Sequence, residues 1–348
     1  MPMNKHQQIT FRSVEEALEK LNAEDKGHYY ICNCPECQQH EAFMYKNNLN
    51  YIQCNRENHC GERMILQYHK KQTPKELQQF KLKQAYPSLN KEQVQALDWA
   101  KKAYKHIKRY FPSKTLDNGY RGLSKEVARD FIVDLQHEGL VQFMFQKIEP
   151  LLGKAYANNE WMCQRNLVFP LYGEDNTLDR IFLRSSINPD LEPKEIQLIT
   201  NPSKDTRDFF MDIPKNAKTV VFTEAILDGL SFREMDASVG FIALTGAAKT
   251  RKVMDYLEKH KEALRDTFFL LAMDDDEAGW EANQNVAGIL ENARVGRDWN
   301  VFSCPEGIKD PNEFLQADRE CFKKQYIKSI APFKTHQRKR EAALEMEL

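Results

Sequence analysis

Short apolar runs that stop at polar or acidic residues mark the second half of the chain. Runs of this length predict buried strands, and longer segments with helical periodicity lie between them. Alternation of strand and helix implies right-handed crossovers and a parallel sheet covered by helices. The expected strands are 219–223, 240–244, 267–273 and 299–303, and the expected helices are about 225–235, 249–263 and 277–294.

The first half of the chain has a different pattern. Short alternating stretches between residues 29 and 63 predict small hairpins, and residues 64–68 predict the start of a helix. Residues 70–90 are polar and rich in Lys and Gln, which predicts a linker. Further along we expect helices at 94–107 and 125–131 and two strands joined by a turn at 166–171 and 179–184.

Two of the predicted strands end at carboxylates. Glu224 follows the strand at 219–223, and Asp274 and Asp276 follow the strand at 267–273. The carboxyl ends of parallel strands meet at one edge of a sheet, where ligands bind. Carboxylates held together repel one another unless a cation lies between them. An all-oxygen cluster favours Mg²⁺ or Mn²⁺ over zinc and suits phosphoryl chemistry.

Other side chains could add oxygens to this site. Asp228 lies one turn into the helix that follows the first of these strands, and Asp310 and Asn312 lie in a loop. Asn312 is the weaker candidate because a neutral amide is a poorer Mg²⁺ ligand. An acid at a helix start can simply stabilise the helix dipole, and we prefer this interpretation for Asp275 and Glu277.

The cysteines suggest a second metal site. Five of the eight lie within residues 32–60, and four of these five form two pairs that two turns could present to a tetrahedral Zn²⁺. One structural zinc would supply much of the folding energy of so small a domain. The predicted ligands are Cys34, Cys37, Cys54 and Cys60. The residues that compete for a ligand position are Cys32, His40 and His59.

Aromatic and basic residues are interleaved around these cysteines. They suit stacking on single-stranded bases, although the aromatic residues could equally form the small core of this cysteine-rich domain. The residues concerned are Phe43, Tyr45, Tyr51, Lys46, Arg56 and Arg63.

Composition limits the remaining choices. The formal net charge is −1, so basic residues must be locally patterned if they bind nucleic acid. No apolar run reaches the roughly 20 residues of a membrane span, and the N-terminus lacks the apolar stretch of a signal peptide. We expect a cytoplasmic protein with no membrane partner, where clustered cysteines bind metal more often than they form disulfides.

These motifs together resemble a known family. Glu224 with Asp228, followed by the acidic stretch at 274–279, resembles the Toprim domain of bacterial-type primases, topoisomerases, some nucleases and recombination proteins. A CHC2-type zinc ribbon ahead of it is similar to the bacterial and phage primase family. The stretches at 120–124, 165–171 and 305–313 resemble further motifs of that family, and the resemblance covers roughly residues 28 to 315.

The resemblance implies an α/β protein whose Toprim subdomain is a Rossmann-like parallel sheet and whose other primase-core subdomain is α+β. About thirty residues follow the core, which is too few for a helicase-binding domain and suggests a compact primase of a phage, plasmid or other mobile element. The implied domains are a zinc ribbon at 1–70, a helical linker at 71–115, the N-terminal subdomain of the primase RNA-polymerase core at 116–217, the Toprim domain at 218–315 and a helical tail at 316–348.

The activity implied is that of a DNA primase, a nucleotidyltransferase that makes short RNA primers from nucleoside triphosphates on a single-stranded DNA template. A replicative helicase is a further candidate partner. Asp274, Asp276 and Asp310 would hold the catalytic metal, and Glu224 would either bind metal or assist proton removal. Candidates for holding triphosphate or template phosphates are Arg121, Arg165, Arg184 and Lys309. The alternatives are a Toprim-type nuclease and a non-catalytic protein that binds single-stranded DNA.

Overall fold

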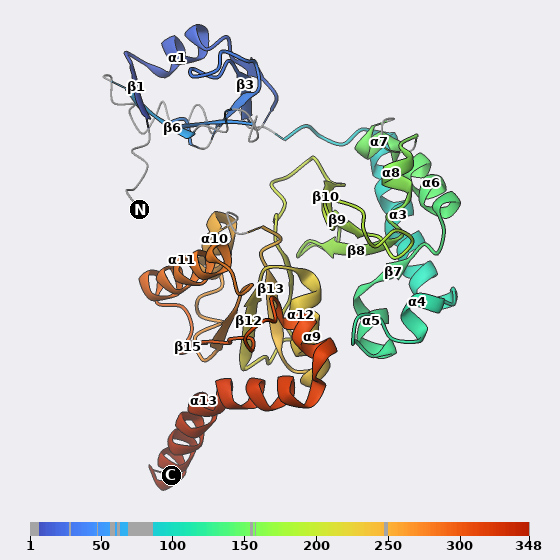
Figure 1. The fold of residues 1–348 in the computed structure, drawn as a ribbon, viewed down its shortest axis with the longest axis vertical. Coiled ribbons are helices and arrows are strands. Elements are labelled where there is room, and N and C mark those ends of the chain that lie inside the picture. Colours follow the sequence, from blue (N-terminus) through green and yellow to red (C-terminus); the bar gives the residue numbers. More distant parts are fainter. Residues whose placement is uncertain are drawn as a thin grey trace. The chain divides into compact units, whose positions relative to one another are not determined.

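The computed structural model divides into two units, Met1–Pro87 and Ser88–Leu348, which we describe separately (Figure 1). Within the described ranges, no helix combines the length and the apolar character that crossing a membrane requires. The predicted linker at 70–90 lies mostly outside these ranges. The described residues are 7–27, 29–46, 48–55, 60, 63–68, 86–153, 156, 158–246 and 250–347.

The first unit is a six-stranded sheet with one helix. The strand order is β1-β6-β5-β4-β3-β2, and the neighbouring strands from β2 to β6 pair antiparallel, as the predicted hairpins require. Strand β1 pairs with β6 in parallel and joins the two ends of the unit's chain. The elements are β1 (Gln7–Phe11), α1 (Val14–Lys20), β2 (Glu24–Asp25), β3 (Tyr29–Cys32), β4 (Ala42–Tyr45), β5 (Tyr51–Cys54) and β6 (Arg63–Tyr68).

Strand β6 corrects the helix that the sequence predicted to start at residues 64–68. Met64 and Leu66 are buried while Ile65 and Gln67 are not, which is the period of a strand. The strand is hydrogen-bonded by β1 on one side and β5 on the other. A five-residue apolar run is too short for periodicity to separate helix from strand, so the pairing partners decide.

The second unit begins with helices packed on a four-stranded antiparallel sheet of order β10-β9-β8-β7. The two predicted strands and the helix predicted at 125–131 are confirmed, and Ser124 caps that helix, since its Oγ accepts the N–H of Val127 at 3.4 Å. The elements are α3 (Lys91–Tyr110), α4 (Lys114–Asp117), α5 (Lys125–Phe131), β7 (Val133–Asp134), α6 (Glu138–Lys147), α7 (Glu149–Leu152), α8 (Glu160–Cys163), β8 (Leu167–Tyr172), β9 (Leu178–Arg184) and β10 (Ile196–Ile199).

Helix α3 falls in the range predicted as a linker, yet it belongs to the core of the second unit. Leu97, Ala100 and Tyr104 are buried and pack in one cluster with Val168 of β8. Val94, which fits the same helical spacing, is 51% exposed because the first turn of the helix extends beyond the sheet-facing cluster. Periodicity located the helix but did not show which of its turns are covered.

A five-stranded sheet of order β11-β13-β12-β14-β15 forms the rest of the unit (Figure 1). Strands β13, β12, β14 and β15 are parallel, and β11 is antiparallel to β13. The four predicted strands and three predicted helices are confirmed to within a few residues. The elements are β11 (Phe210–Asp212), β12 (Thr219–Thr223), α9 (Ile226–Met235), β13 (Gly240–Ala243), α10 (Thr250–Lys259), β14 (Phe268–Ala272), α11 (Glu277–Ala293), β15 (Asp298–Val301), α12 (Pro311–Ala317) and α13 (Arg319–Glu347).

Both faces of this sheet are covered, which explains why its strands are continuously apolar. Phe269 and Leu271 of β14 join a core with α10 and α11, whereas Phe268 and Leu270 join a core with α9, α12 and α13. Strand β12 lies between β13 and β14, so the chain leaves β12 toward one side and returns on the other. The strand order therefore reverses between β12 and β14, where α/β sheets bind ligands.

We predict opposite effects from two helical glycines. A Cβ at Gly229 of α9 would lie 2.2 Å from Cδ2 of Phe241, whereas a Cβ at Gly288 of α11 would meet no atom within 4 Å. Gly229→Ala should lower the free energy of unfolding by about 1–3 kcal/mol through overpacking. Gly288→Ala should raise it by about 0.5–1 kcal/mol through helix propensity. Urea denaturation checks both, and equal effects of the two variants would contradict this packing.

Candidate functional site

The four predicted zinc ligands form a compact sulfur cluster in the first unit. The sulfurs of Cys34, Cys37, Cys54 and Cys60 all lie within 4.8 Å of one another. The Sγ–Sγ distances are 3.8 Å for Cys34 and Cys60 and 3.8 Å for Cys37 and Cys54. Tetrahedral zinc with Zn–S bonds of about 2.3 Å requires sulfurs about 3.8 Å apart, so the donor set fits one Zn²⁺.

Local structure explains why these cysteines meet. Cys34 opens a turn whose amides and carbonyls bond to Gln38 and Gln39, and this turn presents Cys37. Cys54 ends β5 directly opposite Ala42 of β4, which brings the second half of the cluster beside the turn.

The competing ligands lie elsewhere, as far as the described residues show. Cys32 is buried in the core of the unit and is not part of the sulfur cluster. The imidazole of His40 contacts the side chains of Asn33, at 2.7 Å, and Glu24, at 3.7 Å. His59 lies outside the described residues.

Aromatic rings gather on one part of the first unit's sheet. The ring centroids of Phe43 and Tyr45 are 5.4 Å apart, those of Tyr29 and Tyr45 are 6.2 Å apart, and Tyr45 is 50% exposed. Lys46 is buried and donates to both carboxylate oxygens of Asp25 at 2.6 Å, so it stabilises the sheet by linking the end of β4 to β2. The exposed rings remain candidates for base stacking. Arg56 and the Arg63 side chain lie outside the described part of the chain.

The second site is a cavity of about 310 Å³ in the second unit, at the carboxyl ends of β12 and β14. Thr223 of β12 pairs with Ala272 of β14, so Glu224 and Asp274 leave neighbouring strands at the same edge of the sheet. The structure thus brings together acids and bases from segments far apart in the sequence. The charged residues that line the cavity are Glu224, Asp228, Asp274, Asp310, Glu195, Arg121, Arg184, Lys194 and Lys309.

Asp276 is joined to this site through Lys309. The Lys309 ammonium lies 3.3 Å from Asp274 Oδ2 and 3.4 Å from Asp276 Oδ2. Asp276 Oδ1 accepts the N–H of Gly279 at 2.9 Å and so caps α11. A Cβ at Gly279 would lie 2.1 Å from the Asp274 carbonyl oxygen, so only glycine lets the helix start this close. Asp275 between them is exposed.

Asp228 has a different environment from the other acids. It is buried, and its two oxygens accept the N–H groups of Ala225 and Asn312, each at 3.1 Å. The Asn312 amide in turn accepts from Arg121 Nε at 2.8 Å and donates to Ser231 Oγ at 3.0 Å. Asp228 therefore ties the start of α9 to the start of α12, and its role as a Mg²⁺ ligand stays a prediction.

Asp310 also begins a helix. Its Oδ1 accepts the N–H of Glu313 at 2.6 Å, which makes it the N-cap of α12. The carboxylate lines the cavity from that position. Asn312, the weaker predicted ligand, is buried, and both the oxygen and the nitrogen of its side-chain amide are hydrogen-bonded. It therefore positions neighbouring residues of the site.

The electrostatics of the cluster favour a cation. Burial, with the charge of Asp274, raises the pKa of Glu224, and burial raises the pKa of Asp274. Burial also raises the pKa of Asp228 well above its usual value. Asp276 differs, because the Gly279 N–H lowers its pKa. Lys309 supplies one positive charge, and a divalent ion held by carboxylate oxygens would supply two.

The predicted phosphate-binding arginines occupy different positions. Arg121 and Arg184 line the cavity, and Arg184 lies 3.8 Å from Glu195. Arg165 is fully buried and does not line it; its guanidinium donates to the carbonyls of Pro193, at 2.5 Å, and Lys194, at 3.2 Å. The structure therefore places Arg165 behind the loop that carries Lys194 and Glu195, so it positions that loop.

Sequence reasoning missed several lining residues, including Lys194, Glu195, Thr245 and Gly246. Thr245 follows β13 with a φ of +55°, which is uncommon for a β-branched residue, and its N–H donates to the Glu224 carbonyl at 2.7 Å. Strained backbone of this kind collects at functional sites. The rule that strand ends carry ligands, applied to the strand at 240–244, would have found Thr245.

Zinc content provides the first test of this subsection. Elemental analysis of protein purified without chelator should find one zinc per chain. Cys37→Ser should lose the metal and unfold the first unit, because metal binding supplies much of its folding energy. Cys32→Ala, which removes a buried sulfur outside the cluster, should keep one zinc. Zinc-free wild-type protein with an intact first unit would contradict the assignment.

Lys309 provides the second test. Its ammonium competes with any divalent ion for Asp274 and Asp276, so Lys309→Gln should tighten Mn²⁺ binding about fivefold, as expected for an ion pair worth about 1 kcal/mol. Lys194→Gln, also in the cavity but without such a pair, is the matched control. Calorimetric titration with Mn²⁺ measures both, and unchanged or weaker binding by Lys309→Gln would show that the ions bind elsewhere.

Comparison with known proteins agrees with this geometry. A family model described as Toprim-like matches residues 221–315. The zinc-binding and RNA polymerase domains of the Aquifex aeolicus primase superpose with a TM-score of 0.51 at 20% identity, covering 92% of this chain and 83% of that chain. Comparison with curated proteins by sequence finds no significant match.

Two other solved structures are matched less closely. The RNA polymerase domain of the Mycobacterium tuberculosis primase has a TM-score of 0.47 at 16% identity, over 68% of this chain and 83% of that chain. The Escherichia coli primase catalytic core has a TM-score of 0.43 at 16% identity, over 70% and 82%. The family match covers residues 221–315, and the match to the Aquifex aeolicus structure shows that the chain has the fold of the zinc-binding and RNA polymerase domains of a bacterial primase.

Proposed function

We propose that this protein is a DNA primase that joins nucleotides into short RNA primers on a single-stranded DNA template with Mg²⁺. The observation that carries the proposal is the meeting of Glu224 and Asp274 at the point where the strand order reverses, in one cavity with Arg121 and Arg184. Carboxylates for metal beside cations for phosphate are what nucleotidyl transfer requires. The Toprim-like match and the primase fold support the same reading.

Four acids of the site have a place in that reaction. Asp274, Asp276 and Asp310 would hold Mg²⁺, which when bound supplies charge stabilisation for the triphosphate and the leaving pyrophosphate. Their oxygens fit the ion because it prefers carboxylate ligands. Glu224 would either join them or accept the proton of the primer 3′-hydroxyl as that oxygen attacks the α-phosphorus.

The basic residues would hold the substrates. Arg121 and Arg184 offer planar guanidinium groups suited to phosphate oxygens of the triphosphate or the template. Arg121 is fixed for this by its bond to Asn312, at 2.8 Å, and so by the Asp228 network. Lys309, once released from Asp274 and Asp276, would contact the triphosphate. Arg165 would act indirectly, through the loop that carries Lys194.

The zinc-bearing unit would hold the single-stranded template. Its exposed rings at Tyr29 and Tyr45 suit stacking on bases of any sequence. The cytoplasmic location, the mobile-element origin and a replicative helicase as partner remain predictions.

Three neighbouring aspartates provide the test. Asp274→Ala and Asp276→Ala should each reduce primer synthesis by at least about 100-fold, because a group that stabilises the transition state is lost. Asp275→Ala is the matched control and should retain activity, since Asp275 is exposed. The assay supplies single-stranded DNA, Mg²⁺ and labelled ribonucleotides and sizes the oligomers. Normal product from Asp274→Ala, with its fold verified by thermal unfolding, would refute the proposal.

Two further arms of the assay separate the alternatives. Deoxynucleotides in place of ribonucleotides show whether the product is RNA or DNA. DNA with Mg²⁺ and no nucleotides tests for a Toprim-type nuclease. Cleavage that depends on Asp274, without any oligomer synthesis, would assign the site to hydrolysis.

A further inference from the structure

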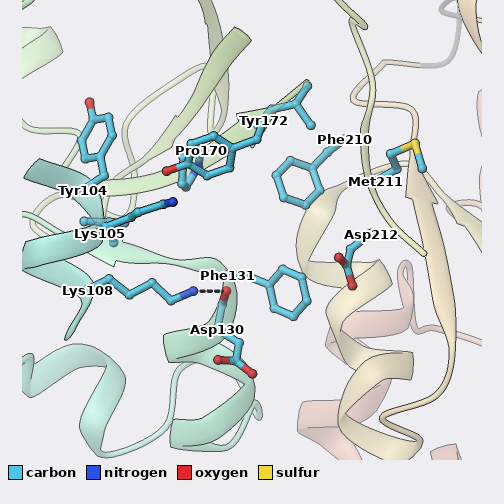
Figure 2. A pocket seen from close by; sticks show the side chains of 12 residues that line it. Tyr104, Lys105, Lys108, Asp130, Phe131, Pro170, Tyr172, Phe210, Met211 and Asp212 are labelled. Carbon is cyan, nitrogen blue, oxygen red and sulfur yellow. Dashed lines mark hydrogen bonds between the residues drawn. The ribbon is translucent and has the colours of Figure 1, made fainter. Parts of the chain in front are cut away.

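The second unit contains another cavity, of about 320 Å³, that shares no lining residue with the carboxylate site (Figure 2). Helix α3 and strand β8 form one side of it, and strand β11 of the five-stranded sheet forms another. Small-molecule sites typically measure about 300–1,000 Å³, are mostly apolar and carry a few polar groups, and this cavity has those properties.

Aromatic rings form its apolar wall. Phe131 and Phe210 both line the cavity, and both rings pack on Phe241, with centroids 5.7 Å and 5.9 Å away. Phe241 and Phe210 are buried in the largest core cluster, and the partly exposed Phe131 packs against that cluster, so its ring is held in place before any ligand arrives. Tyr172 and Pro170 add further flat surface. Such a wall suits the face of a planar ring.

Two ammonium groups face that wall. Figure 2 shows Lys105 and Lys108 reaching from α3 toward the side of the cavity where Phe131 and Phe210 lie. Lys108 donates to the main-chain carbonyl of Asp130, a neutral partner, and Lys105 Nζ lies 5.8 Å from the centroid of the Tyr172 ring. Within the described ranges no carboxylate oxygen lies within 4.0 Å of either ammonium group.

The charges of Asp130 and Asp212 offset only part of the cost of burying Lys108. Asp212 is paired with the Arg233 guanidinium, and the carboxylate of Asp130 is exposed. Burial lowers the pKa of Lys108, which shows that its positive charge lies in a partly desolvated place. Because no carboxylate of the described residues contacts the Lys108 ammonium directly, a bound anion would offset the remaining cost of withdrawing this cation from water.

We propose that this cavity binds a nucleoside monophosphate, with the base against the partly exposed ring of Phe131 and the phosphate on Lys105 and Lys108. An ammonium group is a compact charge suited to phosphate, and the aromatic wall supplies the stacking surface. The proposal does not rest on the proposed primase activity. A ligand here contacts both the four-stranded and the five-stranded sheet, so it stabilises their packing by mass action.

The test is calorimetric titration of the full chain with AMP, in buffer without added divalent metal. AMP should bind at least tenfold more tightly than adenosine or inorganic phosphate, because only AMP uses both the wall and the lysines. Lys105→Gln with Lys108→Gln should weaken AMP at least tenfold and leave adenosine unchanged. Lys102→Gln is the control on the same helix, since Lys102 pairs with Asp98 and does not line the cavity.

Two variants keep the outcome decisive. Lys105 is exposed, so Lys105→Gln alone should fold and still weaken AMP, even if the double variant is unstable. Asp274→Ala should leave AMP affinity unchanged, because AMP binds away from the carboxylate site. Equal AMP affinity in Lys105→Gln and Lys102→Gln, loss of AMP binding in Asp274→Ala, or phenyl phosphate bound as tightly as AMP would each overturn the assignment.

Discussion

The parallel pairing of β12 and β14 is the constraint on which the rest of the second unit depends. Both strands are buried on both faces, so hydrophobic burial fixes them in position and in register. That register sets Thr223 beside Ala272 and leaves the next polar residues, Glu224 and Asp274, at a common edge. Packing of the apolar strands thus forces these carboxylates together despite their repulsion. The basic residues of the cavity, such as Lys309 beside Asp274, reduce that repulsion.

The helices around this edge hold the site through backbone groups. Asp276 and Asp310 cap α11 and α12, and Asp228 accepts amides from the starts of α9 and α12. Each acid therefore accepts an N–H group at the start of its own helix, and Asp228 accepts a second one from α12. Capping and ligand binding, which sequence reasoning treats as alternatives for an acid at a helix start, are compatible at Asp276, because one oxygen caps α11 while the other faces the Lys309 ammonium.

Much of the Toprim-like fold could be predicted, because strands buried on both faces and alternating helices leave a strong pattern in the sequence. The conformation of residues 64–68 could not be predicted, because this short run becomes a strand by pairing with β1 and β5. The motif around Arg165 predicts a phosphate ligand. Arg165 is instead buried and donates to two main-chain carbonyls, which only the tertiary structure reveals. The cavity beside α3 left no pattern at all, because its walls come from four separate segments.

The Asp228 carboxylate has a consequence for motion. It is the shared acceptor for two main-chain amides, at Ala225, the N-cap of α9, and at Asn312, in the first turn of α12. Neither helix start can move away without breaking its bond to this buried carboxyl group, and a buried polar group left without its donors is costly. The two amides should therefore exchange their hydrogens with solvent in a single concerted opening, so that the segments bearing Glu224 and Asp310 behave as one mechanical body.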